Sequence, residues 1–178
     1  MAALRGGQRL LSLCLFFLND ANAGAYAEGL QADRGEEFFY LSLSNTVGGA
    51  VFAHGELSQG KNFRCGEAGH MTLVPDGGLC YCGKKGCLDV YCSAKRLADT
   101  KEGNLEAFFS ALKAGEEKSA ALWEDYTDKL AVAVNNLHMI LDCDIVLGGY
   151  VAVIWNRIWM LSGKKFTSEI RLARACLS

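Results

Sequence analysis

The chain has 178 residues, of which 51% are hydrophobic and 21% are charged, and its formal net charge is −2. This size and apolar content are sufficient to bury a real core, and the length favours one domain. The slightly acidic balance excludes a dominant nucleic-acid-binding surface, because phosphate backbones require clustered positive charge. The cysteines lack the spacing of a disulfide scaffold, which excludes that class of small secreted fold and suits a reducing compartment.

An apolar run occupies residues 10–18, after two arginines and before a small-residue ANA motif. These letters fit either a signal peptide with its cleavage site or a buried strand that delivers a carboxylate to a cleft. The polar pair Asn19-Asp20 directly after the run favours the strand. The run is also too short to span a membrane. We therefore expect a cytoplasmic protein without membrane association.

Helix formers fill residues 20–31, and Asn19 or Asp20 is suited to cap the start of this helix. Two short strands are predicted next, over residues 38–44 and 50–54, joined by a glycine-containing turn at residues 45–49. Apolar spacing then predicts three helices and one buried strand that ends at a glycine pair. These later elements cover residues 88–98, 104–113, 116–141 and 143–147.

The most specific pattern is CYCGKKGC at residues 80–87, with GEAGH upstream at residues 66–70. Three thiols and one imidazole complete a tetrahedral zinc shell. Gly83 and Gly86 permit the tight turns that direct such ligands to one centre. Buried small side chains or disulfide partners are the alternative, but the thiols follow no helical or strand period. A closed shell leaves no open position, so we predict a structural zinc ion bound by His70, Cys80, Cys82 and Cys87.

Other candidate residues have an ordinary structural explanation beside the functional one. Asn19 and Asp20 either face a cleft at the carboxyl end of the preceding strand or only cap a helix. Glu67 either binds a ligand beside the thiols or is a solvated loop side chain. The glycine pairs Gly48-Gly49 and Gly148-Gly149 either let backbone amides approach a phosphate or serve as a hairpin turn and a helix cap.

The order of these motifs, from NDAN through the glycine pair, GEAGH and CYCGKKGC to IVLGG, resembles the ROK family of repressors and sugar kinases. The resemblance covers residues 19–150, and it implies the α/β, actin-like and ribonuclease-H-like fold, in which two lobes bind sugar and ATP between them. By this similarity residues 1–178 form a single carboxyl-terminal lobe whose amino-terminal lobe is missing. Residues 151–178 do not resemble the family's usual last segment and are interpreted as an atypical, truncated end.

The resemblance also implies roles for individual residues. Asp20 matches the general base that takes a proton from the sugar hydroxyl as this hydroxyl attacks the γ-phosphate of ATP. Asn19, Glu67 and His70 match residues that hydrogen-bond the sugar, and Asp89 stands where the family usually has a longer glutamate. The same His70 matches a zinc ligand, so that metal and sugar would meet at one imidazole. If the chain is a kinase, ATP and magnesium would be bound beside the glycines Gly48, Gly49, Gly148 and Gly149.

Two departures concern ATP. The residues Ser44-Asn45-Thr46 replace a glycine-rich start of the second phosphate loop, and the amino-terminal lobe with the first phosphate loop is missing. The sequence therefore favours the sugar-binding lobe of a sugar-responsive transcriptional regulator with DNA-binding helices upstream. An ATP-dependent hexose or amino-sugar kinase, similar to glucokinase, is the alternative. Half of an interlobe site does not exclude water, so we expect no catalysis by this chain alone.

Assembly is predicted from apolar surface. The apolar faces of helix 116–141 and of the segment with Trp155 and Trp159 exceed what a lone lobe would bury. We expect these faces to meet the missing lobe or a second subunit, because relatives in the family commonly form homo-oligomers. The only other partner expected is a hexose or amino-sugar ligand.

Overall fold

The computed structural model describes residues 18–31, 36–159 and 170–172, and these residues form an α/β fold around one mixed sheet. The sheet has five strands in the order β3-β2-β1-β4-β5. Strand β1 pairs antiparallel with β2 and parallel with β4, while β5 extends the parallel side. The strands are β1 (Phe38–Leu43), β2 (Val47–Ala53), β3 (Glu56–Ser58), β4 (Asp144–Gly148) and β5 (Ile170–Leu172).

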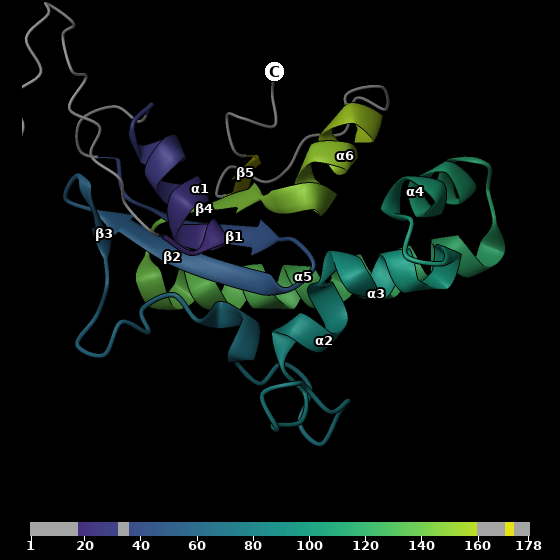
Figure 1. Ribbon diagram of the computed structural model, residues 1–178, viewed down its shortest axis with the longest axis horizontal. Coiled ribbons are helices and arrows are strands. Elements are labelled where there is room, and N and C mark those ends of the chain that lie inside the picture. The colour runs from purple at the N-terminus through teal and green to yellow at the C-terminus, as the bar shows by residue number, and fades with distance from the viewer. Residues whose placement is uncertain (1–17, 32–35, 160–169, 173–178) are drawn as a thin grey trace, which may run out of the picture.

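Helices cover both faces of this sheet (Figure 1). Helices α1 (Asp20–Gly29) and α6 (Gly149–Trp159) pack on one face, and the long α5 (Glu117–Leu141) packs on the other. Buried Ala21 and Ala25 allow α1 to approach the strands closely. Between β3 and α5 the chain forms η1 (Ala68–His70), then the thiol-rich loop of residues 71–87, then four short helical segments. These are α2 (Leu88–Cys92), α3 (Ala94–Ala98), η2 (Asp99–Lys101) and α4 (Leu105–Lys113).

Strand directions bring several loops to one edge of the sheet. The parallel strands β1 and β4 end at this edge, and the antiparallel β2 begins there. Helix α6 starts directly after β4, and Gly48 at the start of β2 faces Ala21 in the first turn of α1. Ligands of open α/β sheets bind at the carboxyl ends of parallel strands. This edge is therefore where a ligand-binding site is expected.

Two predicted elements need correction. The pair Gly48-Gly49 lies within β2, and the turn between β1 and β2 consists of residues 44–46. Both glycines are required by close packing, because a Cβ on Gly48 would lie 2.9 Å from that of Ala21, and one on Gly49 would collide with the backbone of Gly66. The predicted helix 88–98 is divided at Ser93, which is extended and ends α2. The following N–H of Ala94 instead donates to the carbonyl oxygen of Ser44, at 2.7 Å.

The apolar face of α5 is buried inside this chain. Tyr126, Leu130, Val134 and Leu137 are at most 8% exposed, as the apolar spacing predicts. An aromatic cluster joins three helices, because Trp123 of α5 contacts Phe109 of α4 and Trp155 of α6, with ring centres 5.2 Å and 4.9 Å apart. Trp155 is only 7% exposed, so these apolar residues are buried without another lobe or subunit, whereas Met139 and Ile140 of α5 are exposed. Assembly with another lobe or subunit stays a prediction. The side chain of Trp159 lies outside the described residues.

The predicted strand over residues 10–18 falls almost entirely outside the described residues, as do Cys14 and Cys176. Within the described part of the chain, no helix has both the length and the apolar character needed to cross a bilayer.

Candidate functional site

The loop between η1 and α2 is folded by backbone hydrogen bonds and by two left-handed glycines. The N–H of Cys80 donates to the carbonyl oxygen of Lys84 at 2.8 Å, and the N–H of Gly83 donates to that of Cys80 at 2.9 Å. Gly83 and Gly86 have φ of +86° and +76°, a region that favours glycine. A Cβ on Gly86 would also collide with the carbonyl oxygen of Val74. The prediction that these glycines turn the loop is confirmed.

The loop brings the four predicted metal ligands together. The ligand atoms of His70, Cys80, Cys82 and Cys87 all lie within 4.8 Å of one another. The Sγ atoms of Cys82 and Cys87 are 3.6 Å apart, and Cys80 Sγ is 3.8 Å from His70 Nδ1. A tetrahedral ion with bonds of about 2.3 Å to sulfur would separate its ligand atoms by about 3.8 Å. The six cysteines that the structure describes are all free thiols. The residues therefore fit a metal ion.

The thiols of this cluster differ in how readily they lose a proton. Burial, followed by the contacts with Cys82 and Cys80, raises the pKa of Cys87 to about 12. The pKa of Cys82 is lowered, chiefly by a hydrogen bond from the backbone N–H of Lys84. A buried thiol beside other thiols becomes a stable thiolate when a cation is bound. A bound metal ion would therefore supply the positive charge that Cys87 needs in order to ionise.

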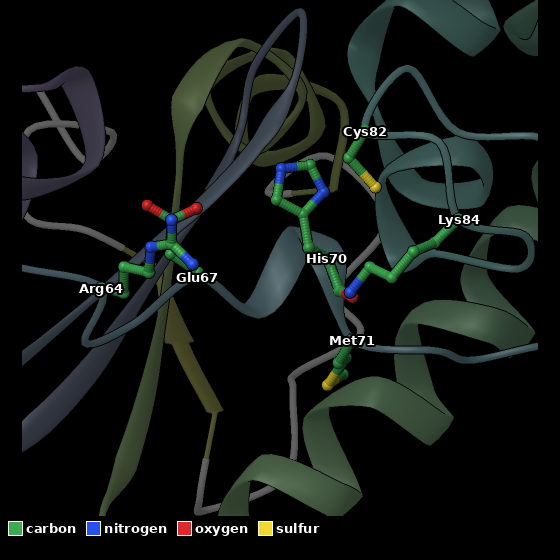
Figure 2. A pocket seen from close by; sticks show the side chains of 6 residues that line it. All are labelled: Arg64, Glu67, His70, Met71, Cys82 and Lys84. Atoms are coloured by element: carbon green, nitrogen blue, oxygen red, sulfur yellow. The ribbon is translucent and has the colours of Figure 1, made fainter. Parts of the chain in front are cut away.

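A cavity of about 650 Å³ lies beside the cluster. Figure 2 shows the His70 ring between Glu67 on one side and Cys82 on the other, while Met71 points away from the ring. Lys84 donates a hydrogen bond of 2.8 Å to the carbonyl oxygen of His70. The described lining residues are Arg64, Glu67, His70, Met71, Cys82 and Lys84. The cavity thus combines one carboxylate, one imidazole and two cations, which suit a ligand with many hydroxyl groups.

Sequence reasoning missed Tyr81, Arg64 and Lys84 as residues of this site. The hydroxyl group of Tyr81 lies 3.2 Å from His70 Nε2, and the two rings meet edge to face with centres 5.2 Å apart. With Nδ1 facing Cys80, this contact occupies the second ring nitrogen of His70. Tyr81 and Lys84 lie inside the thiol motif itself, and this position in the sequence was the only signal that could have identified them as site residues.

Asn19 and Asp20 lie at the start of α1, outside the lining of the cavity. The side-chain oxygen of Asn19 accepts the N–H of Asn22 at 2.7 Å, which is the predicted helix cap. Oδ1 of Asp20 accepts the N–H of Ala21 at 2.9 Å, and the Asp20 side chain is exposed. A Cβ on Gly48 would lie 3.8 Å from this oxygen. Asp20 is therefore beside the first residues of β2, at the sheet edge where β1 and β4 end.

The side chain of Asp89 is buried and is not exposed as a ligand-binding carboxylate would be. Its side chain is 7% exposed, and Oδ1 accepts the N–H of Val47 at 2.6 Å. Asp89 and Glu67 both raise the pKa of Tyr81, although burial contributes more. Asp89 thus fixes the start of β2 from the first turn of α2 and lies within electrostatic reach of Tyr81.

The second glycine pair also has a steric origin. A Cβ on Gly148 would collide with the hydroxyl group of Tyr40, and one on Gly149 would lie 2.7 Å from both the backbone N of Leu43 and Oγ of Ser44. Gly149 has φ of +81°. This packing places the β4–α6 junction against the turn after β1. The structure thus brings Gly149 and Ser44 together at the same sheet edge as Gly48 and Asp20.

Known proteins share this architecture. The N-acetylmannosamine kinase of Escherichia fergusonii is 31% identical over 154 residues, which are 82% of this chain and 53% of the kinase. A ROK hexokinase from Thermus thermophilus has a TM-score of 0.72 and 29% identity, covering 89% of this chain and 59% of the hexokinase. A ROK family transcriptional regulator, a homologue of the E. coli MLC protein, has a TM-score of 0.66 at 20% identity, covering 86% and 46%.

The likeness to the transcriptional regulator, at 20% identity, shows a shared fold and nothing more. The chain spans about half the length of the curated relatives it matches. A sequence model of the ROK family matches residues 8–155. The chain therefore belongs to the ROK family, and its sheet has the actin-like fold of the family's sugar kinases.

Proposed function

We propose that this chain forms the sugar-binding part of a ROK kinase that phosphorylates a hexose or an amino sugar. The observation that carries the proposal is the place of Asp20. This exposed carboxylate starts α1, next to Gly48, at the edge where two parallel strands end. Curated relatives that are 30–31% identical include N-acetylmannosamine kinases, which favours a kinase over a regulator.

In this mechanism Asp20 acts on the sugar hydroxyl that attacks ATP. Its Oδ1 is oriented by the N–H of Ala21, so that Oδ2 can accept the proton of the hydroxyl. The sugar oxygen forms a bond to the γ-phosphorus, the bond from phosphorus to the ADP oxygen breaks, and ADP leaves with the bond's electrons. Glu67, which lines the cavity, would accept hydrogen bonds from other sugar hydroxyls. With zinc on Nδ1, His70 would carry its proton on Nε2, beside the Tyr81 hydroxyl group, and would donate a hydrogen bond there.

The thiol cluster would hold a structural zinc ion. Three thiols and one imidazole match the ligands of such sites, and a closed shell supplies order rather than a reactive water. His70 belongs to both the cluster and the cavity lining. Zinc on Nδ1 would fix the orientation of the His70 ring. The ring edge that lines the cavity would then be held in place for contact with the sugar.

A sugar-responsive regulator is the second candidate, on one specific observation. The turn between β1 and β2 carries Asn45 and Thr46, both exposed, where side chains hinder backbone approach to a phosphate. In a regulator the sugar would bind at the same cavity, but ATP would not be turned over.

The two candidates are separated by replacing Asp20 with Asn in the complete protein. A kinase should lose sugar phosphate formation by at least about 100-fold, while its affinity for the sugar, measured by calorimetry with hexoses and N-acetylated amino sugars, stays within a few-fold. Glu67→Gln should weaken sugar binding about tenfold, and Glu56→Gln on the exposed edge strand β3 serves as the control. Sugar binding without any ATP turnover by the wild type would reject the kinase and support the regulator.

A further inference from the structure

Tyr91 of α2 connects the thiol-rich loop to the rest of the molecule. Its hydroxyl oxygen accepts a hydrogen bond of 2.8 Å from the backbone N–H of Gly78, two residues before Cys80. The carbonyl oxygen of Gly78 in turn accepts the N–H of Gly86 at 2.8 Å, directly before Cys87. Gly78 is therefore bonded to Tyr91 on one side and to the second ligand-bearing segment on the other.

The loop is shaped to receive this hydroxyl group. A Cβ on Gly77 would collide with the Tyr91 oxygen, so that a residue with a side chain would displace the contact. The N–H of Gly77 is bonded to the carbonyl oxygen of Val74 at 3.0 Å. Two successive loop residues are thus fitted to the end of one tyrosine side chain.

The ring of Tyr91 is fixed from α3 and α5. Lys129 Nζ lies 5.4 Å and Arg96 Cζ 5.7 Å from the ring centre, within the range of attraction between a cation and ring electrons. The carboxylate of Asp125 accepts hydrogen bonds from both cations. Arg96 also donates to the carbonyl oxygen of Tyr91 at 2.8 Å. One carboxylate on the long helix therefore orders the two cations that contact the ring.

We propose that Tyr91 is a positioning residue for the metal centre, which it supports through Gly78 without binding the metal. The contacts run from Asp125 through the cations to Tyr91, then through Gly78 to the segments with Cys80 and Cys87. Hydrogen-bonded groups behind metal ligands hold those ligands in binding geometry, and their loss commonly weakens metal affinity by about 10- to 100-fold. This inference rests on the proposed zinc centre.

The test is Tyr91→Phe, which keeps the ring and removes only the hydroxyl group. Two measurements are made on the full chain: hydrogen exchange of the Gly78 amide in the zinc-free protein, and transfer of zinc to a chromogenic chelator in the loaded protein. We expect Gly78 to exchange about tenfold faster and zinc to be released several-fold faster. Tyr150→Phe is the matched control, because Tyr150 is 58% exposed on α6, and it should change neither value.

A second variant, Asp125→Asn, reaches the same contact from α5 and should change both values in the same direction but less. Unchanged Gly78 exchange and zinc release in Tyr91→Phe would overturn the proposal. Equal loss of amide protection throughout the sheet would also overturn it, because Tyr91 would then support general packing. If the wild type binds no zinc, the metal centre fails as a proposal, while Gly78 exchange in the zinc-free protein still decides whether Tyr91 positions the loop.

Discussion

Leucines occupy opposite environments in the sheet and in the thiol-rich loop. Leu41 in the central strand β1 is 0% exposed, whereas Leu79 beside the first thiol is 72% exposed. The strands are stabilised by burial of apolar side chains, and the loop by backbone hydrogen bonds, by Tyr91 and by the proposed zinc ion. Changes in the loop should therefore affect binding locally, while changes in the sheet should affect the whole fold.

Leu41 and Leu79 test the comparison most strongly. Leu41→Ala should lower the free energy of unfolding by about 2–5 kcal/mol, because it removes buried methyl groups and leaves a cavity. Leu79→Ala should change it by less than about 0.5 kcal/mol, as for most exposed positions. Urea unfolding followed by circular dichroism measures both. Similar losses in the two variants would mean that the loop packs as a part of the core.

Loss of one metal ligand should have a large effect that stays local. Cys82→Ser should reduce zinc affinity by at least about 100-fold, since a thiolate ligand is replaced by a neutral hydroxyl. Amides of residues 78–86 should then exchange faster, while those of β1 and β4 keep their protection. Cys65→Ser, which changes a thiol outside the cluster, is the control. Loss of protection in both regions would show that the loop and the sheet unfold together.

Gly49 tests the contact between the sheet and the segment around Gly66, which leads to the thiol-rich loop. Gly49→Ala should destabilise the protein by about 1–3 kcal/mol, because the new Cβ collides with the backbone of Gly66 and with the ring of Phe39. Gly115→Ala meets no atom within 4 Å but has φ of +82°, so it should cost only the backbone strain, about 1 kcal/mol. Thermal unfolding compares the two. An equal cost would indicate that β2 and the Gly66 segment shift apart easily.

The ion pairs of Asp125 should contribute only weakly to stability. Lys129 and then Arg96 hold the pKa of Asp125 below its usual range. A lowered pKa in the folded state stabilises the protein fully above the unfolded value of about 4, and this contribution is lost as the pH falls through the lower folded-state pKa. It should stay below about 1 kcal/mol, because the carboxylate is 42% exposed. Urea midpoints of wild type and Asp125→Asn should therefore differ at pH 7 and approach each other as the pH falls below about 4, and a constant difference would contradict this assignment.

Local patterns predicted much of this architecture, and tertiary contacts explain the errors. The period of α5 and the spacing of the thiols are local, so the buried face of the helix and the ligand cluster were predictable. Gly48-Gly49 was interpreted as a turn because glycine pairs are typical of turns. Here they allow close packing of α1 and the Gly66 segment on β2, and no local pattern reveals such neighbours.

The same limit applies to the candidate site. Glu67 and His70 share a cavity, as their spacing and the resemblance indicated. The buried contact of Asp89 with Val47 and the bond from Gly78 to Tyr91 join segments that are distant in the sequence. A single sequence contains no signal for such pairs, because hydrogen bonds of this kind depend on how the helices dock.

The central strand also has a consequence for synthesis on the ribosome. Tyr40 pairs with Ala50 on one side and with Val146 on the other. The hairpin of β1 and β2 can thus form early, but the second edge of β1 stays open until β4 has been translated. An exposed apolar strand edge is a template for pairing with other chains. The nascent protein should therefore depend on chaperones during that interval, and synonymous changes that slow translation between the two strands should increase its aggregation.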